Sequence, residues 1–284
     1  GFAVGVEYRE DSGWSNPDAL KVLGIANSNK EDIISGKIKA KEAYAELSVP
    51  LLNDMPMVDS LELNMALRYS DYTDIGDSTN YKIGLNWQIV EDLKIRGTYA
   101  TAFRAPNVPE LFGGIRQGQL TTTDPCSSWS SMNPSSAIYQ NCQAAGVPNG
   151  YVQPGNTVLT DLGANPDLKP EDSRSITIGA VWQPSFANGL SVTLDYFDFK
   201  LTNAITTANG TDILNQCYIS DSLSHPFCGP TYHRRNSLTG VVDYLSAQKS
   251  NAGIEYLKGF DFGAVYNFEA FDNANSFDLN VTYL

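Results

Sequence analysis

The most regular feature of the chain is a strict alternation of apolar and polar side chains over nine segments. Every second residue of a segment is apolar, and the residues between are mostly polar or small. This two-residue period is the period of a β-strand with one apolar face. The apolar positions of the three clearest segments are Leu61, Leu63, Met65, Leu67 and Tyr69, then Tyr81, Ile83, Leu85, Trp87 and Ile89, then Leu93, Ile95, Gly97 and Tyr99.

The same alternation recurs on both sides of these three segments. The other six lie at 2–8, 41–49, 176–182, 192–196, 260–268 and 277–283. Several approach the roughly 9–11 residues that a tilted strand needs to cross a bilayer. The pattern predicts an all-β chain, an antiparallel meander of about nine strands with one apolar and one polar face.

The connections between the segments differ strongly in length. Glu91-Asp92 and the region of Asn188-Gly189 predict tight hairpin turns. Residues 104–172 and 203–239 predict long irregular loops, which are uncommon inside a soluble domain. Alternation of short and long connections is typical of a membrane barrel whose two rims face different compartments. We therefore expect the long loops at the outer face of a transmembrane barrel.

Composition neither opposes nor proves this interpretation. The mean hydropathy is −0.25, and no apolar run reaches the roughly 18–20 residues of a membrane helix. In a barrel only every second residue meets lipid, so a low mean hydropathy is expected. A net charge of −13 argues against a nucleic-acid partner, because phosphate binding requires a basic surface.

Aromatic residues gather toward the ends of the segments. Trp and Tyr favour membrane interfaces, which predicts two aromatic girdles. The core of a soluble β-sandwich is the competing interpretation, because its strands alternate in the same way. The residues concerned are Tyr69, Tyr72, Trp87, Tyr99, Phe103, Trp182 and 196–199.

Four cysteines form two close pairs, Cys126 with Cys142 and Cys217 with Cys228, one in each long loop. Three connectivities are possible, and proximity favours pairing within each loop. Neither pair has Cys-x-x-Cys spacing, and the chain has only two histidines, so disulfides are favoured over metal ligands. Disulfides imply an oxidising compartment.

Two phrases connect the strand pattern to a known family. Residues 97–112, which contain Phe-Arg-Ala-Pro and Glu-Leu, resemble a signature of TonB-dependent receptors at the passage from barrel wall to extracellular loop. Residues 165–179 contain Leu-Lys-Pro-Glu and resemble the family motif that opens the next descending strand. The matching residues are Phe103, Arg104, Ala105, Pro106, Glu110, Leu168, Lys169, Pro170 and Glu171.

These motif residues also have a simple physical interpretation. Pro106, Pro109 and Pro170 lack the backbone donor that a strand ladder needs, so they predict where strand pairing ends. The charged members are expected near the rim, where they stay hydrated and pair with one another. The cysteine loops, together with residues 251–262, are similar to a subgroup of large receptors with disulfide-bearing extracellular loops.

The resemblance implies a receptor of the bacterial outer membrane that takes up a scarce nutrient, such as a siderophore or an oligosaccharide, with energy from TonB. Residues 1–284 would be part of a 22-stranded barrel, and the plug domain, the TonB box and the closing strand would be absent. The implied partners are the TonB complex through the missing plug, outer-membrane lipid, and a small-molecule or oligosaccharide ligand. Polar side chains expected to face plug or water are Glu62, Asn64, Arg68, Lys94, Arg96, Thr98 and Asp195.

Aromatic and basic residues of the long loops are the candidates for ligand capture. Rings stack on sugars or catechols, and arginines hold anions. Internal packing of the loops is the competing interpretation. The candidates are Trp129, Tyr139, Tyr151, Tyr218, Phe227, Tyr232, His233, Arg234 and Arg235.

The sequence predicts no enzyme and no catalytic, cofactor or metal site, because the usual nucleophile, phosphate-loop and metalloprotease motifs are missing. Two alternatives to a TonB-dependent receptor remain. One is a passive porin-type barrel, which has no need for the two motifs. The other is a secreted soluble β-sandwich binding domain, which would have to bury its apolar faces under a second sheet.

Overall fold

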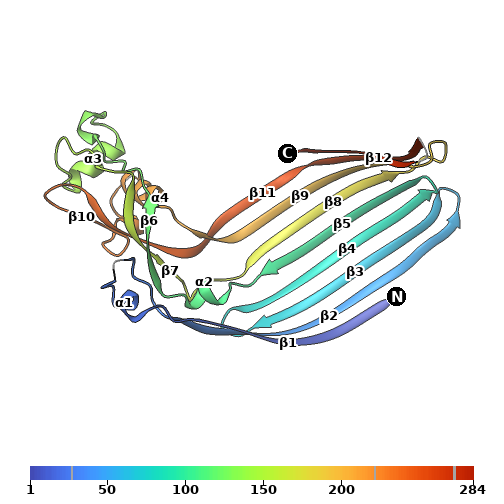
Figure 1. Cartoon of the computed structure of the whole chain (residues 1–284), viewed down its shortest axis with the longest axis horizontal. Coiled ribbons are helices and arrows are strands. Elements are labelled where there is room, and N and C mark those ends of the chain that lie inside the picture. The colour runs from blue at the N-terminus through green and yellow to red at the C-terminus, as the bar shows by residue number, and fades with distance from the viewer. Residues whose placement is uncertain (27, 221, 271–272) are drawn as a thin grey trace.

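Nine strands of the computed structural model form one continuous antiparallel sheet (Figure 1), and the structure describes residues 1–26, 28–220, 222–270 and 273–284. Each of the nine pairs with the next in chain order, which confirms the predicted meander. The strands are β1 (Phe2–Ser15), β2 (Ile34–Met55), β3 (Val58–Tyr72), β4 (Gly76–Val90), β5 (Leu93–Arg104), β8 (Glu171–Trp182), β9 (Leu190–Thr207), β11 (Val242–Ala270) and β12 (Asn273–Tyr283).

The strand register joins the predicted apolar sets into one apolar face. Met65 lies opposite Leu47 on one side and Ile83 on the other, and Tyr196 lies opposite Ile178 and Phe260. Cross-strand partners share a face of the sheet, so the alternation continues from β1 to β12. The interleaved residues form the polar face.

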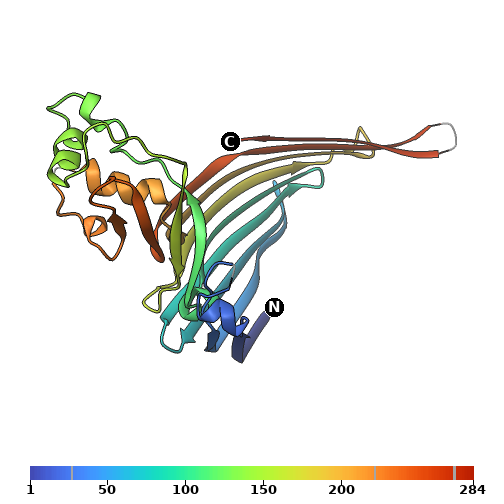
Figure 2. The ribbon, with the colours of Figure 1, turned by 60° about the vertical axis from the view of Figure 1, so that its left-hand side comes forward.

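The apolar face is open, and its side chains are exposed. On β1, for example, Phe2, Val4 and Val6 are 80%, 72% and 86% exposed. Figure 2 shows the nine strands as a single curved layer, and no second sheet covers them in the ranges that the structure describes. The β-sandwich alternative is therefore wrong, because a soluble domain would have to bury a surface of this size.

The predicted aromatic girdles need a correction at four positions. Tyr69, Tyr99, Trp87 and Trp182 lie on the apolar face, as a girdle requires. Tyr72 and Phe197 fall on the polar-face parity of their strands and are only 8% exposed, and Phe199 has the same parity and stacks on Phe197. Phe103 packs edge-to-face on Tyr72, with their ring centroids 5.4 Å apart. These four aromatics therefore contribute to packing on the inner side and at the rim.

One end of the sheet, here called the turn rim, carries short connections. Residues 56–57, 91–92 and 183–189 link consecutive strands there. Gly189 has a φ of +88°, and a Cβ at this position would lie 2.1 Å from the carbonyl oxygen of Asn267. Glycine is therefore required at the turn that the sequence predicted. The turn between β11 and β12 falls on residues 271–272, outside the described residues.

The opposite end, here called the loop rim, carries the connections 16–33, 73–75, 105–170 and 208–241. The expected alternation of short and long connections is wrong at 73–75. Asp74 and Gly76 both adopt positive φ there, which lets three residues close the β3–β4 hairpin. The connection 16–33 contains α1 (Ala19–Val22), whose N-terminus is capped by Asp18.

The two long loops are folded rather than irregular, which corrects a second expectation. They contain a small sheet in which β6 pairs with β7 and β7 pairs in parallel with β11, the strand that continues past the loop rim (Figure 1). We call residues 115–163 and 208–247 the cap. Its elements are β6 (Ile115–Thr121), η1 (Trp129–Ser131), α3 (Ala137–Ala144), β7 (Thr157–Gly163), α4 (Gly210–Tyr218), η2 (Pro226–Cys228) and β10 (His233–Arg235).

The cap has an apolar core of its own, to which Trp129, Leu214, Val242 and Leu245 contribute. These residues come from three segments that are far apart in the sequence, so no periodic pattern could predict the core. Within the described part of the chain, no helix combines the length and the apolarity that crossing a membrane would require.

Candidate functional site

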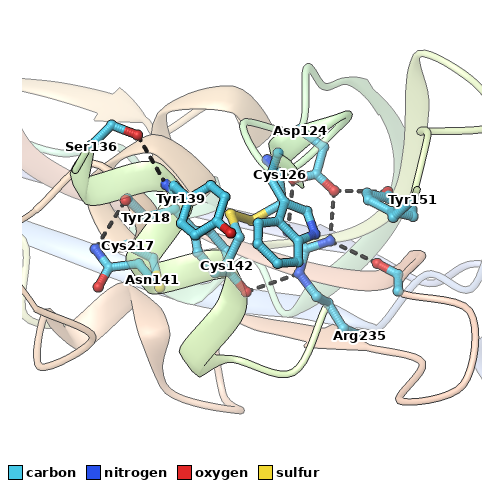
Figure 3. The surroundings of a disulfide bond; sticks show 12 residues. Asp124, Cys126, Ser136, Tyr139, Asn141, Cys142, Tyr151, Cys217, Tyr218 and Arg235 are labelled. Carbon is cyan, nitrogen blue, oxygen red and sulfur yellow. Dashed lines mark hydrogen bonds and ion pairs between the residues drawn. A yellow bond between two sulfur atoms is a disulfide. The ribbon is translucent and has the colours of Figure 1, made fainter. Parts of the chain in front are cut away.

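Two disulfides fasten the cap from within, and Figure 3 shows the surroundings of the first, between Cys126 and Cys142. Cys126 bonds to Cys142 with a Cα–Cα distance of 5.7 Å, and Cys217 bonds to Cys228 with a Cα–Cα distance of 4.9 Å. Both follow the within-loop pairing expected from the sequence. The sulfur-bearing side chains of the first pair are fully buried against Trp129 in the cap core. Each disulfide therefore closes one loop, and the shared apolar core packs the two loops together.

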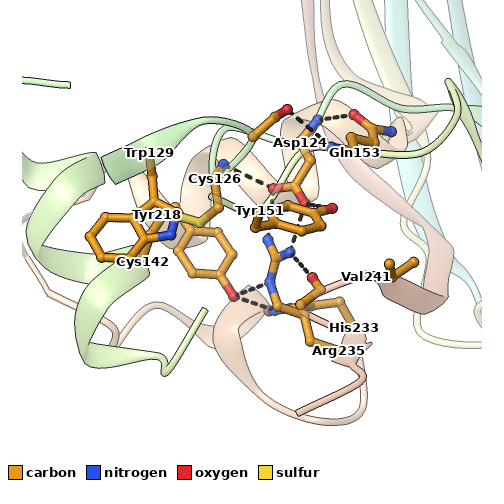
Figure 4. A network of polar contacts seen from close by, with 12 residues as sticks. Asp124, Cys126, Trp129, Cys142, Tyr151, Gln153, Tyr218, His233, Arg235 and Val241 are labelled. Atoms are coloured by element: carbon orange, nitrogen blue, oxygen red, sulfur yellow. Dashed lines mark hydrogen bonds and ion pairs between the residues drawn. A yellow bond between two sulfur atoms is a disulfide. The ribbon is translucent and has the colours of Figure 1, made fainter. Parts of the chain in front are cut away.

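A buried ion pair joins the two loops of the cap (Figure 4). The Arg235 guanidinium donates to both carboxylate oxygens of Asp124 at 2.6 and 2.7 Å. The side chains are 9% and 1% exposed. Asp124 also accepts hydrogen bonds from the Cys126 backbone N–H and from the Tyr151 hydroxyl. Burial, together with the neighbouring Asp124 carboxylate, raises the pKa of Tyr151.

A hydrogen-bonded relay continues from this ion pair to η2. Arg235 Nε donates to the Tyr218 hydroxyl at 2.9 Å, and that oxygen lies 3.2 Å from His233 Nε2. His233 Nδ1 lies 2.8 Å from the carbonyl oxygen of Phe227. Because a carbonyl only accepts, Nδ1 carries the proton and Nε2 accepts from Tyr218. Burial lowers the pKa of His233, so the ring is neutral in the folded cap.

A neutral, buried His233 predicts that acid loosens the cap. The folded pKa lies below the unfolded value of about 6.5, so the stabilisation is complete above that pH and is lost as pH falls through the folded pKa. Hydrogen exchange of the full-length receptor, corrected for intrinsic rates, should show less protection of α4 and β10 at pH 5 than at pH 7.5. His233→Gln should abolish this pH response and His225→Gln should keep it. An equal response in both variants would contradict the assignment.

Loss of the first disulfide should destabilise the cap without affecting the wall. Cys126 and Cys142 are 16 residues apart, and closing a loop of that size stabilises a fold by about 3 kcal/mol. Replacing both by serine should bring proteolytic cleavage into 127–150, while protection of β3 and β4 stays unchanged. Unchanged resistance of 127–150 to protease would show that the disulfide contributes little to the cap.

At the loop rim, glutamates from both family-like motifs form ion pairs with the same arginine. Arg104, at the end of β5, donates to Glu171 at 2.6 and 2.9 Å and to Glu110 at 2.9 and 3.3 Å. Glu110 also accepts from the backbone of Asn107 and closes a capping box on α2 (Val108–Phe112). Glu171 accepts from the Ile205 backbone N–H at 2.7 Å. The cluster therefore connects β5, α2, β8 and β9.

Residues beside this cluster fasten the start of β8 to β11. Lys169 uses its backbone N–H and carbonyl to bond the Asn251 side chain, both at 2.8 Å, and Asn251 also donates to the carbonyl of Asn203. Leu168 is buried in an apolar cluster that includes Ile38 and Leu111. The prediction that the motif residues lie at the rim and pair there agrees with this geometry. The sequence indicates Asn251 only through the similarity of residues 251–262 to a subgroup of receptors.

The polar face carries paired charges. Arg96 forks onto Asp195 at 2.8 and 2.9 Å, Arg68 bonds to Glu42, and Ser48 donates to Glu62 at 2.9 Å. A hollow of about 670 Å³ near the loop rim is lined by residues that include Glu7, Arg9, Glu42, Tyr44, Arg68 and Tyr72. Asn64, Lys94 and Thr98 lie on the same face. Contact of these side chains with a plug or with water remains a prediction.

The structure places most of the proposed ligand-capture residues inside the cap. Trp129, Tyr151, Tyr218 and His233 are buried at 2–7% exposure, and Arg235 is held by Asp124. Tyr139, Phe227 and Tyr232 pack on the same core. Arg234 is exposed and lies over the Tyr244 ring at 4.4 Å. Their role in ligand binding stays a prediction, and only Arg234 projects from the cap surface.

Sequence reasoning missed two residues that organise the cap. Asp124 anchors the ion pair, and Asn141 donates to the backbone carbonyls of Tyr218 and Ser220, linking the two loops. The one sequence signal for the importance of Asp124 is its position directly before Pro125 and the disulfide-forming Cys126. Nothing in the spacing of Asn141 distinguishes it from other loop asparagines.

Comparison with known proteins is consistent with this architecture. A family model described as "TonB dependent receptor-like, beta-barrel" matches residues 1–284. The ferric enterobactin receptor PfeA of Pseudomonas aeruginosa is similar in fold, with a TM-score of 0.59 and 18% identity over 100% of this chain and 33% of that one. The siderophore receptor PirA of the same organism has a TM-score of 0.57 and 18% identity over 99% of this chain and 39% of that one. The chain thus spans a third to two fifths of the solved receptors it matches.

Proposed function

Because the chain belongs to the TonB-dependent receptor β-barrel family of the bacterial outer membrane, we propose that its parent protein imports a scarce nutrient by TonB-driven transport. The match over residues 1–284 carries this proposal. Residues 1–284 supply barrel wall, lumen lining and an extracellular cap. The chain is a transporter component and not an enzyme.

In this assignment the apolar face meets lipid, the polar face meets the lumen, and the cap stands on the outer side. Paired charges such as Arg96 with Asp195 suit a lumen that a plug domain or water fills. The cap is held by two disulfides, and disulfides persist in oxidising, extracytoplasmic compartments. TonB would act through the plug domain, which lies outside the family match.

For the ligand, we propose an iron-loaded siderophore as the first candidate and an oligosaccharide as the second. Two receptors of similar fold are named for siderophores, and that naming selects the first probe. The cap offers the exposed Arg234 and the half-buried rings of Tyr139, Phe227 and Tyr232, and an arginine suits an anionic catecholate. An oligosaccharide would use the same aromatic groups by stacking.

The test is uptake by cells that carry the full-length receptor and lack their other siderophore receptors. Iron-loaded enterobactin and a panel of oligosaccharides serve as probes, in hosts with and without TonB. Energy-coupled import predicts that accumulation of at least one probe requires both the receptor and TonB. Receptor-dependent uptake that persists without TonB would favour the passive porin-type alternative and overturn the proposal.

A further inference from the structure

Three cations lie in two adjacent cross-strand rows of the apolar face near the loop rim. Arg174 of β8 is directly opposite Lys200 of β9, which in turn is opposite Tyr256 of β11. Lys258 of β11 is opposite Asp198 of β9. Arg174, Lys200 and Lys258 are spaced from Ile176, Tyr196 and Phe260 by multiples of two residues on their strands. Their side chains therefore leave the sheet on the side that meets lipid.

The cluster has an excess of positive charge. Like charges directly opposite each other in a sheet are destabilising, and Arg174 with Lys200 is such a pair. Asp198 is the one carboxylate within the patch, with its Oδ1 3.5 Å from Arg174 Nη2. The ammonium of Lys200 lies 5.3 Å from the centre of the Tyr256 ring. Asp172, which is two residues closer to the cap than Arg174 on β8, accepts a hydrogen bond from the side chain of Asn203.

The excess is notable because the whole chain carries a net charge of −13. An acidic protein gains nothing in solubility from three clustered cations on a lipid-facing surface. A membrane-facing cation cluster is instead typical of anionic lipid headgroup recognition. The charge of the patch is therefore complementary to phosphate.

The cluster also lies at the correct height for a headgroup. On β11, Lys258 is ten residues from Phe268, which lies near the turn rim on the same face. At about 3.3 Å per residue and a strand tilt of about 40°, these two residues are separated by about 25 Å along the membrane normal. The apolar band of an outer-membrane barrel is about 25 Å tall. With the cap outside, the cluster lies where the outer leaflet begins.

We propose that Arg174, Lys200 and Lys258 form a binding site for the phosphate groups of an outer-leaflet lipid, the lipid A part of lipopolysaccharide. Long basic side chains reach along the apolar surface and place their charges at the headgroup level. Arginine matches the oxygen geometry of phosphate, and lysine adds point charges. The exposed Tyr256 ring lies beside them at the interface, where tyrosine is favoured. The site depends on the orientation of the barrel but not on the transported nutrient.

The test uses the full-length receptor in detergent and measures its affinity for bis-phosphorylated lipid A. Removing one cation near a membrane surface weakens binding about fivefold. Lys200→Gln with Lys258→Gln should therefore bind at least about tenfold more weakly than the native receptor. Lys82→Gln with Lys94→Gln is the matched control, because it removes the same charge from the polar face of the same sheet. Lys200→Arg with Lys258→Arg should retain binding, which separates loss of charge from misfolding.

Two further probes identify the source of the phosphate. Dephosphorylated lipid A should bind the native receptor as weakly as bis-phosphorylated lipid A binds the glutamine variant, and millimolar inorganic phosphate should not displace bis-phosphorylated lipid A. Equal affinity of the glutamine variant and the native receptor would overturn the proposal, as would an equal loss in the polar-face control. Displacement by inorganic phosphate would overturn the lipid assignment. Nutrient uptake by the same variants separates this site from transport, because either property can fail while the other persists.

Discussion

Replacing Arg235 with methionine is expected to unfold the cap locally while the barrel wall stays intact. The change leaves the Asp124 carboxylate, 1% exposed, without its cation. Breaking a buried ion pair in this way costs about 3–5 kcal/mol. The loss should show as faster hydrogen exchange in α3, α4 and β10 of the full-length receptor, with β3 to β5 unchanged.

The neighbouring residue supplies the matched control for this variant. Arg234 is exposed and contacts the Tyr244 ring. Arg234→Met should therefore change the free energy of opening of the cap, as measured by hydrogen exchange, by less than about 1 kcal/mol. Combining Arg235→Met with Asp124→Asn should recover part of the protection, because the stranded charge is removed as well. Similar exchange in the Arg234 and Arg235 variants would show that the ion pair does not hold the cap.

The second large effect is expected at the loop rim, where Arg104→Lys should loosen α2 and the start of β8. Lysine keeps the charge but cannot fork onto two carboxylates at once. Glu110 and Glu171, at 11% and 10% side-chain exposure, then lose charge-assisted hydrogen bonds worth about 1.5–3 kcal/mol. We expect a loss at the lower end of this energy range, because the Arg104 side chain is 45% exposed and solvent weakens its ion pairs.

Trypsin susceptibility of residues 105–116 and hydrogen exchange of α2 measure this change. Arg116→Lys, on the exposed start of β6, makes the same substitution outside the cluster and should leave α2 protected. If Arg104→Lys and Arg116→Lys gave the same exchange profile, the motif arginine would not be fastening the rim.

The wall was predictable from the sequence because its pattern is local and uniform. Each wall residue meets one of two environments, so Leu61 to Tyr69 reveal their face by alternation alone. The same alternation places Tyr72 and Phe197 on the polar face, where the structure has them. Their assignment to the aromatic girdles was wrong because it did not take this alternation into account. The turn at Gly189 was likewise predictable, because Asn188-Gly189 is a typical hairpin-turn sequence. The positive φ at this position explains why glycine is needed there.

The cap was not predictable because its contacts are long-range and non-periodic. Asp124 and Arg235 are 111 residues apart in sequence, and no spacing rule connects them. The family-like phrases identified Arg104, Glu110 and Glu171 as important residues, yet only the fold shows that they form one cluster. Residues chosen as ligand contacts, such as Trp129 and Tyr218, proved to be core residues of the cap. Aromatic residues in a long loop do not by themselves distinguish a binding surface from a core.

The central claim is that the alternating faces of this sheet separate lipid from lumen. Its most direct measurement is the accessibility of nitroxide labels placed singly at residues 176–180 of β8 in the full-length receptor in bilayers. Labels at Ile176, Ile178 and Ala180 should be relaxed mainly by oxygen, which dissolves in lipid, and labels at Thr177 and Gly179 mainly by a water-soluble nickel complex. Absence of this two-residue alternation, or its reversal, would contradict the account.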